Sequence, residues 1–283
     1  MASHQLMIER LPDCGVGLVY HPEMRNDVSR FRDKIDYLEL IADRVLSDLG
    51  LQEARFLAGE FRLLFHGLRL SIGSDQLPDT TYVKSLATVV QKFDPHWISD
   101  HIALTRVGDI ELGRLLPVPF SADSASVICR NVRHIQLAFG CPFLLENIAY
   151  YFIAPGTELD EASFITSVLE ATNSGMLLDL NNLYVNSVNH GYDPYRFLSA
   201  LPLQRVIEVH IAGHAWRDEI AVDTHGHAVD PEVWALLEWV CAHARVRAVT
   251  LERDQNIPDF SEIVSELDRM RAIWQQGRRL SSS

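Results

Sequence analysis

The chain has 283 residues, of which 47% are hydrophobic, so it can bury a large core and has an ordinary length for one α/β barrel. Its formal net charge of −13 argues against unaided binding to nucleic acid or to an anionic membrane surface. The four cysteines are scattered, the N-terminus has no apolar signal core, and no run approaches the ~20 apolar residues of a membrane span. These features predict a cytoplasmic globular protein with reduced thiols.

Short apolar runs alternate with segments of helical period along the chain. Eight runs are predicted to be strands: 15–20, 37–41, 61–67, 97–102, 143–148, 175–180, 206–211 and 248–253. Helices are predicted around 82–93, 121–139, 160–169, 231–240 and 263–273. Ser121 and Asp160 suit helix N-caps, and Pro231 suits a first helical turn.

This alternation predicts an α/β protein built as a single (β/α)₈ TIM-type barrel domain over residues 1–283. The rival interpretation is a doubly wound open sheet. No Gly-rich phosphate loop follows the first predicted strand, 15–20, so the barrel is favoured.

Ionisable side chains stand at or near the C-terminal ends of six successive predicted strands. They are His66, His101, Glu146, Asp179, His210 and Glu252. Asn182 follows three residues after Asp179, and Asp223 with His225 lies on the loop after the seventh strand, at a spacing that lets both face one ion. In a barrel all these positions converge on the C-terminal rim, where active sites are built.

A metal centre explains this set better than packing does. One buried histidine, or one acid paired with an arginine, is common in a core. Six successive strand ends of this kind are costly unless the groups are paired or bind metal. Two or three divalent ions would supply the missing charge, and imidazole with carboxylate suits zinc, manganese or iron without choosing among them. His214 is a weaker ligand candidate, and Asp100 and Asn147 are predicted to face the other side of their strands and either pack against helices or support neighbouring ligands.

The ordered set resembles the multinuclear non-heme iron-dependent oxidases, formerly a family of unknown function (DUF692, or UPF0276). The resemblance covers about 15–258. Its motifs include Leu64-Phe-His-Gly-Leu-Arg-Leu-Ser-Ile-Gly-Ser, Leu177-Leu-Asp-Leu-Asn-Asn-Leu-Tyr, Val209-His-Ile-Ala-Gly-His and Val222-Asp-Thr-His-Gly. It implies a triosephosphate-isomerase-type barrel with two or three iron ions and dioxygen as co-substrate. It also implies a precursor peptide substrate, oxidised at a cysteine or another residue, and a small partner protein that holds the peptide leader.

The ligand order is also similar to that of the trinuclear zinc endonucleases of the endonuclease IV type, and this likeness implies how the ligands divide. One ion would take His66, His101 and Glu146, and a second would share Glu146 and take Asp179, His210 and Glu252. The third would take Asn182, Asp223 and His225. The zinc enzymes have a histidine where this chain has Asn182, a neutral ligand, so the third site is expected to hold its ion most weakly. Glu146, Asp179 and His210 are the predicted catalytic residues, and no residue is assigned to an organic cofactor.

Two other functions remain open from the sequence. The first is a zinc- or manganese-dependent hydrolase or sugar isomerase of the endonuclease IV or xylose isomerase type, with a bridging hydroxide as nucleophile. The charge of −13 disfavours a DNA substrate for it. The second is a non-catalytic metal-binding protein, whose ligands would close every coordination position.

Overall fold

A computed structural model describes residues 8–280. Eight parallel strands form its centre: β1 (Gly15–Val19), β2 (Tyr37–Ile41), β3 (Arg62–His66), β4 (Ile98–His101), β7 (Phe143–Glu146), β8 (Gly175–Asp179), β9 (Val206–Ile211) and β12 (Ala248–Leu251). They close into a barrel in the order β1-β12-β9-β8-β7-β4-β3-β2. Each predicted strand corresponds to one of them, so the predicted (β/α)₈ barrel is confirmed.

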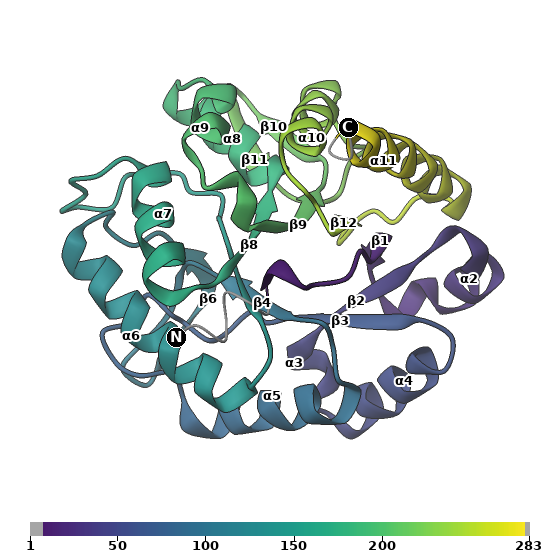
Figure 1. The fold of residues 1–283 in the computed structure, drawn as a ribbon, viewed down its shortest axis with the longest axis horizontal. Coiled ribbons are helices and arrows are strands. Elements are labelled where there is room, and N and C mark those ends of the chain that lie inside the picture. Colours follow the sequence, from purple (N-terminus) through teal and green to yellow (C-terminus); the bar gives the residue numbers. More distant parts are fainter. Residues whose placement is uncertain (1–7, 281–283) are drawn as a thin grey trace.

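Helices surround these strands as an outer ring (Figure 1). They are α2 (Arg25–Arg30), α3 (Ala42–Val45), α4 (Asp48–Ala58), α5 (Thr80–Phe93), α6 (Ala122–Phe139), α7 (Glu161–Thr172), α8 (Leu180–His190), α9 (Pro194–Ala200), α10 (Pro231–His243) and α11 (Phe260–Leu280), with short 3₁₀ turns η1 (Pro22–Met24), η2 (Arg32–Lys34) and η3 (Leu203–Arg205). The predicted caps hold: Ser121 accepts a hydrogen bond from the Ser124 amide, and Asp160 accepts one from the Ser163 amide. Within the described residues no helix is long and apolar enough to cross a membrane.

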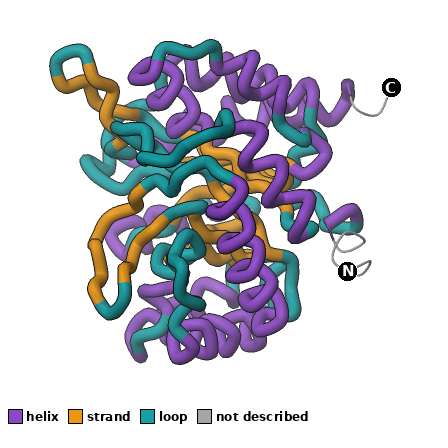
Figure 2. The backbone as a smooth tube through the Cα atoms, turned by 90° about the vertical axis from the view of Figure 1, so that its left-hand side faces the viewer, coloured by secondary structure: helices purple, strands orange, loops and turns teal. Residues whose placement is uncertain are grey.

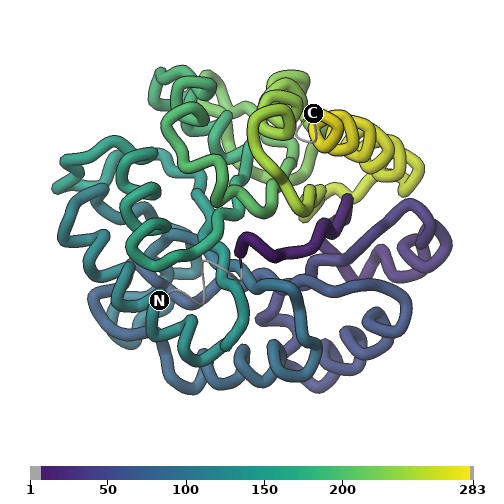
Figure 3. The backbone as a smooth tube through the Cα atoms, viewed as in Figure 1, coloured from purple at the N-terminus to yellow at the C-terminus, as the bar shows by residue number. Residues whose placement is uncertain are grey.

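The barrel is closed by strands from opposite ends of the chain. Figure 3 shows the N-terminal strand β1 beside the yellow-green β12. The two pair in parallel, with Gly15 opposite Ala248 and Leu18 opposite Leu251. Because all eight strands are parallel, their C-terminal ends meet at one rim of the barrel.

Two antiparallel hairpins interrupt the βα alternation. One is β5 (Leu104–Val107) with β6 (Ile110–Leu116), and the other is β10 (His214–Arg217) with β11 (Ile220–Asp223). They follow β4 and β9, so both belong to the C-terminal rim, and Figure 2 shows them projecting on the same side of the molecule. Neither hairpin was expected from the sequence.

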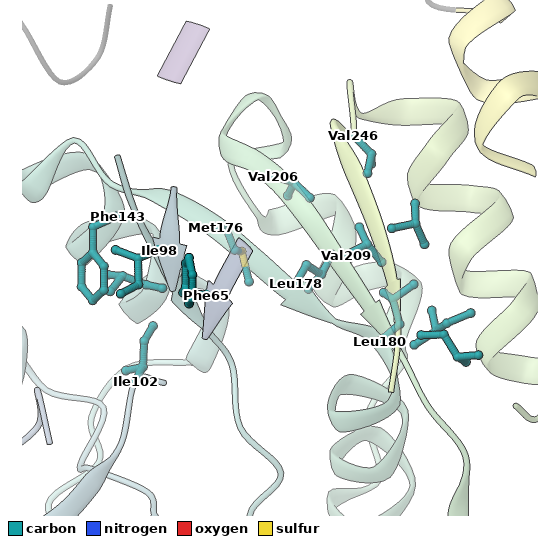
Figure 4. Packing of buried hydrophobic residues seen from close by; sticks show 14 of the residues in the cluster. Phe65, Ile98, Ile102, Phe143, Met176, Leu178, Leu180, Val206, Val209 and Val246 are labelled. Carbon is teal, nitrogen blue, oxygen red and sulfur yellow. The ribbon is translucent and has the colours of Figure 1, made fainter. Parts of the chain in front are cut away.

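Apolar side chains fill both faces of the barrel wall. On the outside, residues such as Phe65, Ile98 and Phe143 pack on neighbouring strands and belong to the large core shared with the helices (Figure 4). A second cluster is inward-facing and includes Tyr37, Leu64, Trp97, Leu144, Leu177, Ile207 and Ala248. We call these seven residues the barrel floor. Side chains of a strand alternate between its two faces, so the next inward positions lie one layer nearer the rim.

Candidate metal centre

The ionisable residues of the rim stand on the same strands as the floor. Asp179 comes two residues after the floor residue Leu177, and Glu146 comes two residues after Leu144. A step of two positions keeps the side chain inside the barrel and moves it toward the C-terminal end. The six strand-end residues form what we call the barrel rim: His66, His101, Glu146, Asp179, His210 and Glu252. All six are buried.

Three of them form a compact first group. The Nε2 atoms of His66 and His101 are each 3.2 Å from Glu146 Oε2. The two imidazole nitrogens are 3.3 Å apart. One nitrogen from each histidine and one carboxylate oxygen therefore face a common point, which is the arrangement that a single divalent ion requires.

A second group shares Glu146 and adds Asp179, His210 and Glu252, with one donor atom of each lying within 4.8 Å of the others. His210 Nδ1 is 3.4 Å from Glu252 Oε1 and 3.7 Å from Glu146 Oε1. The two oxygens of Glu146 thus face different groups, Oε2 the first and Oε1 the second. This geometry suits a carboxylate that bridges two ions.

The remaining predicted ligands line a cavity that also reaches His66, His101 and Glu146 and has a volume of about 610 Å³. They are Asn182, Asp223 and His225. His225 Nε2 is 2.7 Å from Asp223 Oδ1, and His225 adopts a left-handed backbone with φ of 49°. The backbone N–H of Asn182 donates to Asp179 Oδ1, and its side-chain Nδ2 donates to the backbone carbonyl of Asn147. These bonds direct Asn182 without using its side-chain oxygen.

Missing hydrogen bonds among these residues indicate whether they fit a metal ion. Buried polar atoms normally have a partner, because a buried orphan costs roughly 1–3 kcal/mol. Eight nitrogen and oxygen atoms of the predicted ligands are buried without a hydrogen bond of normal geometry to a described residue: His101 Nδ1, Glu146 Oε2, Asp179 Oδ2, Asn182 Oδ1, both ring nitrogens of His210, His225 Nε2 and Glu252 Oε2. The donor set and its unused atoms therefore fit divalent ions.

Burial changes the protonation of this cluster. It raises the pKa of Asp179 to about 7 and that of Glu146 to about 8. Burial, with His101 and His210 nearby, holds the pKa of His66 well below its usual range. In the metal-free protein protons therefore compete with cations for the two carboxylates, whereas His66 is neutral and ready to bind.

Further polar groups hold the ligands in place. Ser99 Oγ is 2.8 Å from His66 Nδ1, and Asp254 Oδ2 is 3.1 Å from His225 Nδ1. His21 Nε2 in turn is 3.0 Å from Asp254 Oδ1. Contacts of this kind orient a ligating imidazole. The sequence analysis missed all three residues, although Asp254 carried a usable signal, since it stands two residues after Glu252.

The residues predicted to be supporting or doubtful ligands have other partners. Asp100 accepts hydrogen bonds from the amides of His101 and Leu70. Asn147 exchanges two hydrogen bonds with the Asp179 backbone, at 2.9 Å each. His214 Nδ1 is 3.1 Å from Asn181 Oδ1 and 3.2 Å from Asp230 Oδ2, and His214 belongs to neither ligand group.

The fold is shared with other proteins of known structure. A xylose isomerase domain protein from Planctomyces limnophilus has a TM-score of 0.62 at 14% identity, over 95% of this chain and 100% of that chain. Endonuclease IV from Thermus thermophilus has a TM-score of 0.56 at 16% identity, over 93% of this chain and 99% of that chain. At these identities the likeness shows the fold alone.

Sequence relatives are closer. A UPF0276 protein from Caulobacter vibrioides is 34% identical over 94% of this chain and 95% of its own length. One from Shewanella loihica is 35% identical over 90% and 92%. The family model described as "RiPP precursor modification enzyme MbnB/TglH/ChrH", where RiPP denotes a ribosomally synthesised and post-translationally modified peptide, matches residues 15–275. The chain therefore belongs to the MbnB/TglH/ChrH family of RiPP precursor modification enzymes, together with the UPF0276 proteins.

Proposed function

We propose that this protein is a dioxygen-dependent multinuclear iron oxidase that modifies a cysteine, or another residue, of a ribosomally made precursor peptide. The observation that carries the proposal is the placement of Glu146 between two groups of buried donors. A peptide-modifying family supports the substrate class.

In this proposal three ions divide the ligands, and the first two share Glu146. His66, His101 and Glu146 hold the first ion, and Glu146, Asp179, His210 and Glu252 hold the second. Asn182, Asp223 and His225 hold the third, the weakest because Asn182 is neutral. Iron supplies the redox chemistry, with dioxygen as oxidant and the peptide as reductant.

The chain's own part is to bind, orient and shield. Glu146, Asp179 and His210 are the proposed catalytic residues, since their donor atoms face the reacting centre. The cavity of about 610 Å³ has room for a peptide side chain. Leu115 and Leu116 of β6 and Tyr151 line it, and these side chains exclude water from the side chain being oxidised. We place the function in one barrel domain, assisted by a small partner protein that holds the peptide leader.

A second candidate function is a zinc- or manganese-dependent hydrolase or sugar isomerase. It is supported by the solved structures of the same fold, which include D-psicose 3-epimerase from Clostridium cellulolyticum, with a TM-score of 0.56 at 14% identity over 94% of this chain and 99% of that chain. The shared Glu146 suits a hydroxide between two ions as well as it suits iron.

The decisive experiment combines metal analysis with peptide oxidation. Protein prepared without oxygen should contain iron, consume dioxygen only with the precursor peptide, and change that peptide's mass. A Cys→Ser peptide is the matched control and should bind without dioxygen uptake. Zinc-filled protein that turns over a substrate without dioxygen would refute the oxidase and favour the hydrolase. Filled sites without any turnover would favour a metal-binding protein.

A further inference from the structure

The barrel interior holds two glutamates that the ligand set does not use. Glu39 on β2 and Glu208 on β9 are both 0% exposed. Glu39 comes two residues after the floor residue Tyr37, and Glu208 comes two residues before His210. They occupy a layer between the barrel floor and the barrel rim. A buried carboxylate is costly, so each of them calls for a partner.

His210 connects this layer to the metal centre. Its Nδ1 faces the second ligand group, 3.4 Å from Glu252 Oε1. Its Nε2 faces the opposite way, 3.1 Å from Glu39 Oε1. A neutral imidazole carries one N–H and one lone pair, so a ring that binds an ion through Nδ1 must carry its proton on Nε2.

The two glutamates differ in what else they contact. Glu208 Oε2 accepts a hydrogen bond from Trp97 Nε1 at 2.7 Å, and its Oε1 accepts one from Thr250 Oγ1 at 2.7 Å. Glu208 Oε1 is also 3.9 Å from His210 Nε2, beyond hydrogen-bonding distance. Glu39 makes no such bonds, and the 3.1 Å approach of its Oε1 to His210 Nε2 is the shortest polar contact of either atom given by the described residues.

We propose that Glu39 is a positioning residue that accepts the Nε2–H of His210, fixes its tautomer, and directs Nδ1 to the ion held with Glu146, Asp179 and Glu252. This inference rests on the metal centre of the proposed function. It has one structural rival, an ion held between Glu39, Glu208 and His210, whose donor atoms also lie within 4.8 Å of one another. That ion would bind His210 Nε2, so the ring would carry its proton on Nδ1. Nδ1 would then donate to Glu146 or Glu252 and could not bind the ion held with them.

The test measures metal affinity and metal-free stability on the same variants. Glu39→Leu and Glu39→Gln are compared with the parent, and Glu208→Gln is the matched control from the same layer. Metal-free protein is titrated with Co²⁺ by visible absorption and with Fe²⁺ under anaerobic conditions, and unfolding is followed by circular dichroism. We expect Glu39→Leu to bind one ion roughly 10–100-fold more weakly. Glu39→Gln should recover part of this loss, because its amide oxygen still accepts the Nε2–H.

The metal-free unfolding midpoint separates positioning from a structural role. Removing one partner of a buried pair is destabilising, so Glu39→Leu should unfold below the parent midpoint, whereas Glu39→Gln keeps an acceptor for the His210 Nε2–H and should unfold near it. Glu208→Gln should keep the parent affinity. Unchanged affinity in both Glu39 variants would overturn the proposal, as would an equal loss in Glu208→Gln. An equal loss in Glu208→Gln is the result that favours the rival ion, because that ion needs both glutamates.

Two outcomes keep this inference separate from the proposed function. If Glu39→Leu does not fold, Glu39→Gln decides alone, since it preserves size and shape. If the parent binds its ions but does not oxidise the peptide, the proposed function fails while the affinities still test Glu39.

Discussion

The barrel floor and the barrel rim are made by the same strands but differ in what they bury. The floor packs Leu64, Trp97, Leu144 and their neighbours without exposed surface, and burial of such side chains stabilises the fold by about 1.5–3 kcal/mol each. The rim, nearer the C-terminal ends of these strands, buries carboxylates and imidazoles that include atoms without a hydrogen bond, which costs stability. The floor therefore stabilises the fold, whereas the rim lowers its stability and holds the atoms that we propose as metal ligands.

The largest expected effect lies in the floor. Leu177→Ala should lower the free energy of unfolding of the metal-free protein by about 2–5 kcal/mol, because it leaves a cavity in a tightly packed layer. Denaturant unfolding measures this. The exposed Leu137→Ala, whose side chain is 86% exposed in the parent, is the control and should change little. Equal losses in the two variants would contradict the role given to the floor.

The next effect lies at the centre of the rim. Glu146→Gln should lower metal content at two sites and abolish turnover, since one oxygen faces each ligand group. Saturating metal at about 100 times its dissociation constant stabilises the parent by about 2.7 kcal/mol, and the variant should lose most of this gain. Metal analysis and thermal unfolding with and without metal measure both. Normal metal stoichiometry in the variant would refute the bridging assignment.

The rim should also respond to pH, whereas the apolar floor should not. The pKa of Asp179 is raised to about 7 and that of Glu146 to about 8, and both must lose a proton to bind a cation. Metal affinity should therefore fall as pH drops from 8 to 6, on the order of tenfold per unit for each group still titrating. The sign reverses for their contribution to metal-free stability, which is greatest below the ordinary pKa values of 3.8 and 4.5, declines as pH rises from there to about 7 to 8, and is lost above that range. Affinity that is flat between pH 6 and pH 8 would contradict these shifts.

The smallest effect is expected outside the barrel rim, at the proposed third ion site. Replacing both Asp223 and His225 by Ala should give a folded, partly loaded protein, because these residues lie on a separate segment and are absent from the two inner groups. Iron content per chain should drop while the inner ions remain. Thr224→Ala, between them in the sequence, is the matched control. Loss of all metal with an intact fold would show that the sites are not separate.

The barrel was predictable because its strands are short apolar runs, and all eight predicted runs correspond to barrel strands. The hairpins β5–β6 and β10–β11 were not, since their strands are mostly short and half-exposed and mix apolar with polar residues without a clear alternation. The helices α8 and α9 were also missed, although Asp179 caps α8 and Asp193 caps α9. In both cases an N-cap signal was present, but the apolar period was weak.

The chain order of strand-end histidines and acids was enough to select the nine residues that line or adjoin the cavity, and their role as ligands remains a prediction. Glu39 stands in the middle of an equally apolar run and was missed, because it lies opposite Leu64 rather than His66 once β2 pairs with β3, and only the folded barrel brings it to His210.

By itself, then, the sequence determined the barrel and the set of ionisable strand ends, because a period of two and an apolar core are local properties of a strand. The tertiary structure decided which oxygen of Glu146 faces which group and which nitrogen of His210 faces Glu39. Those choices depend on the register of eight strands and on the closing of β1 against β12, and no single strand carries that information.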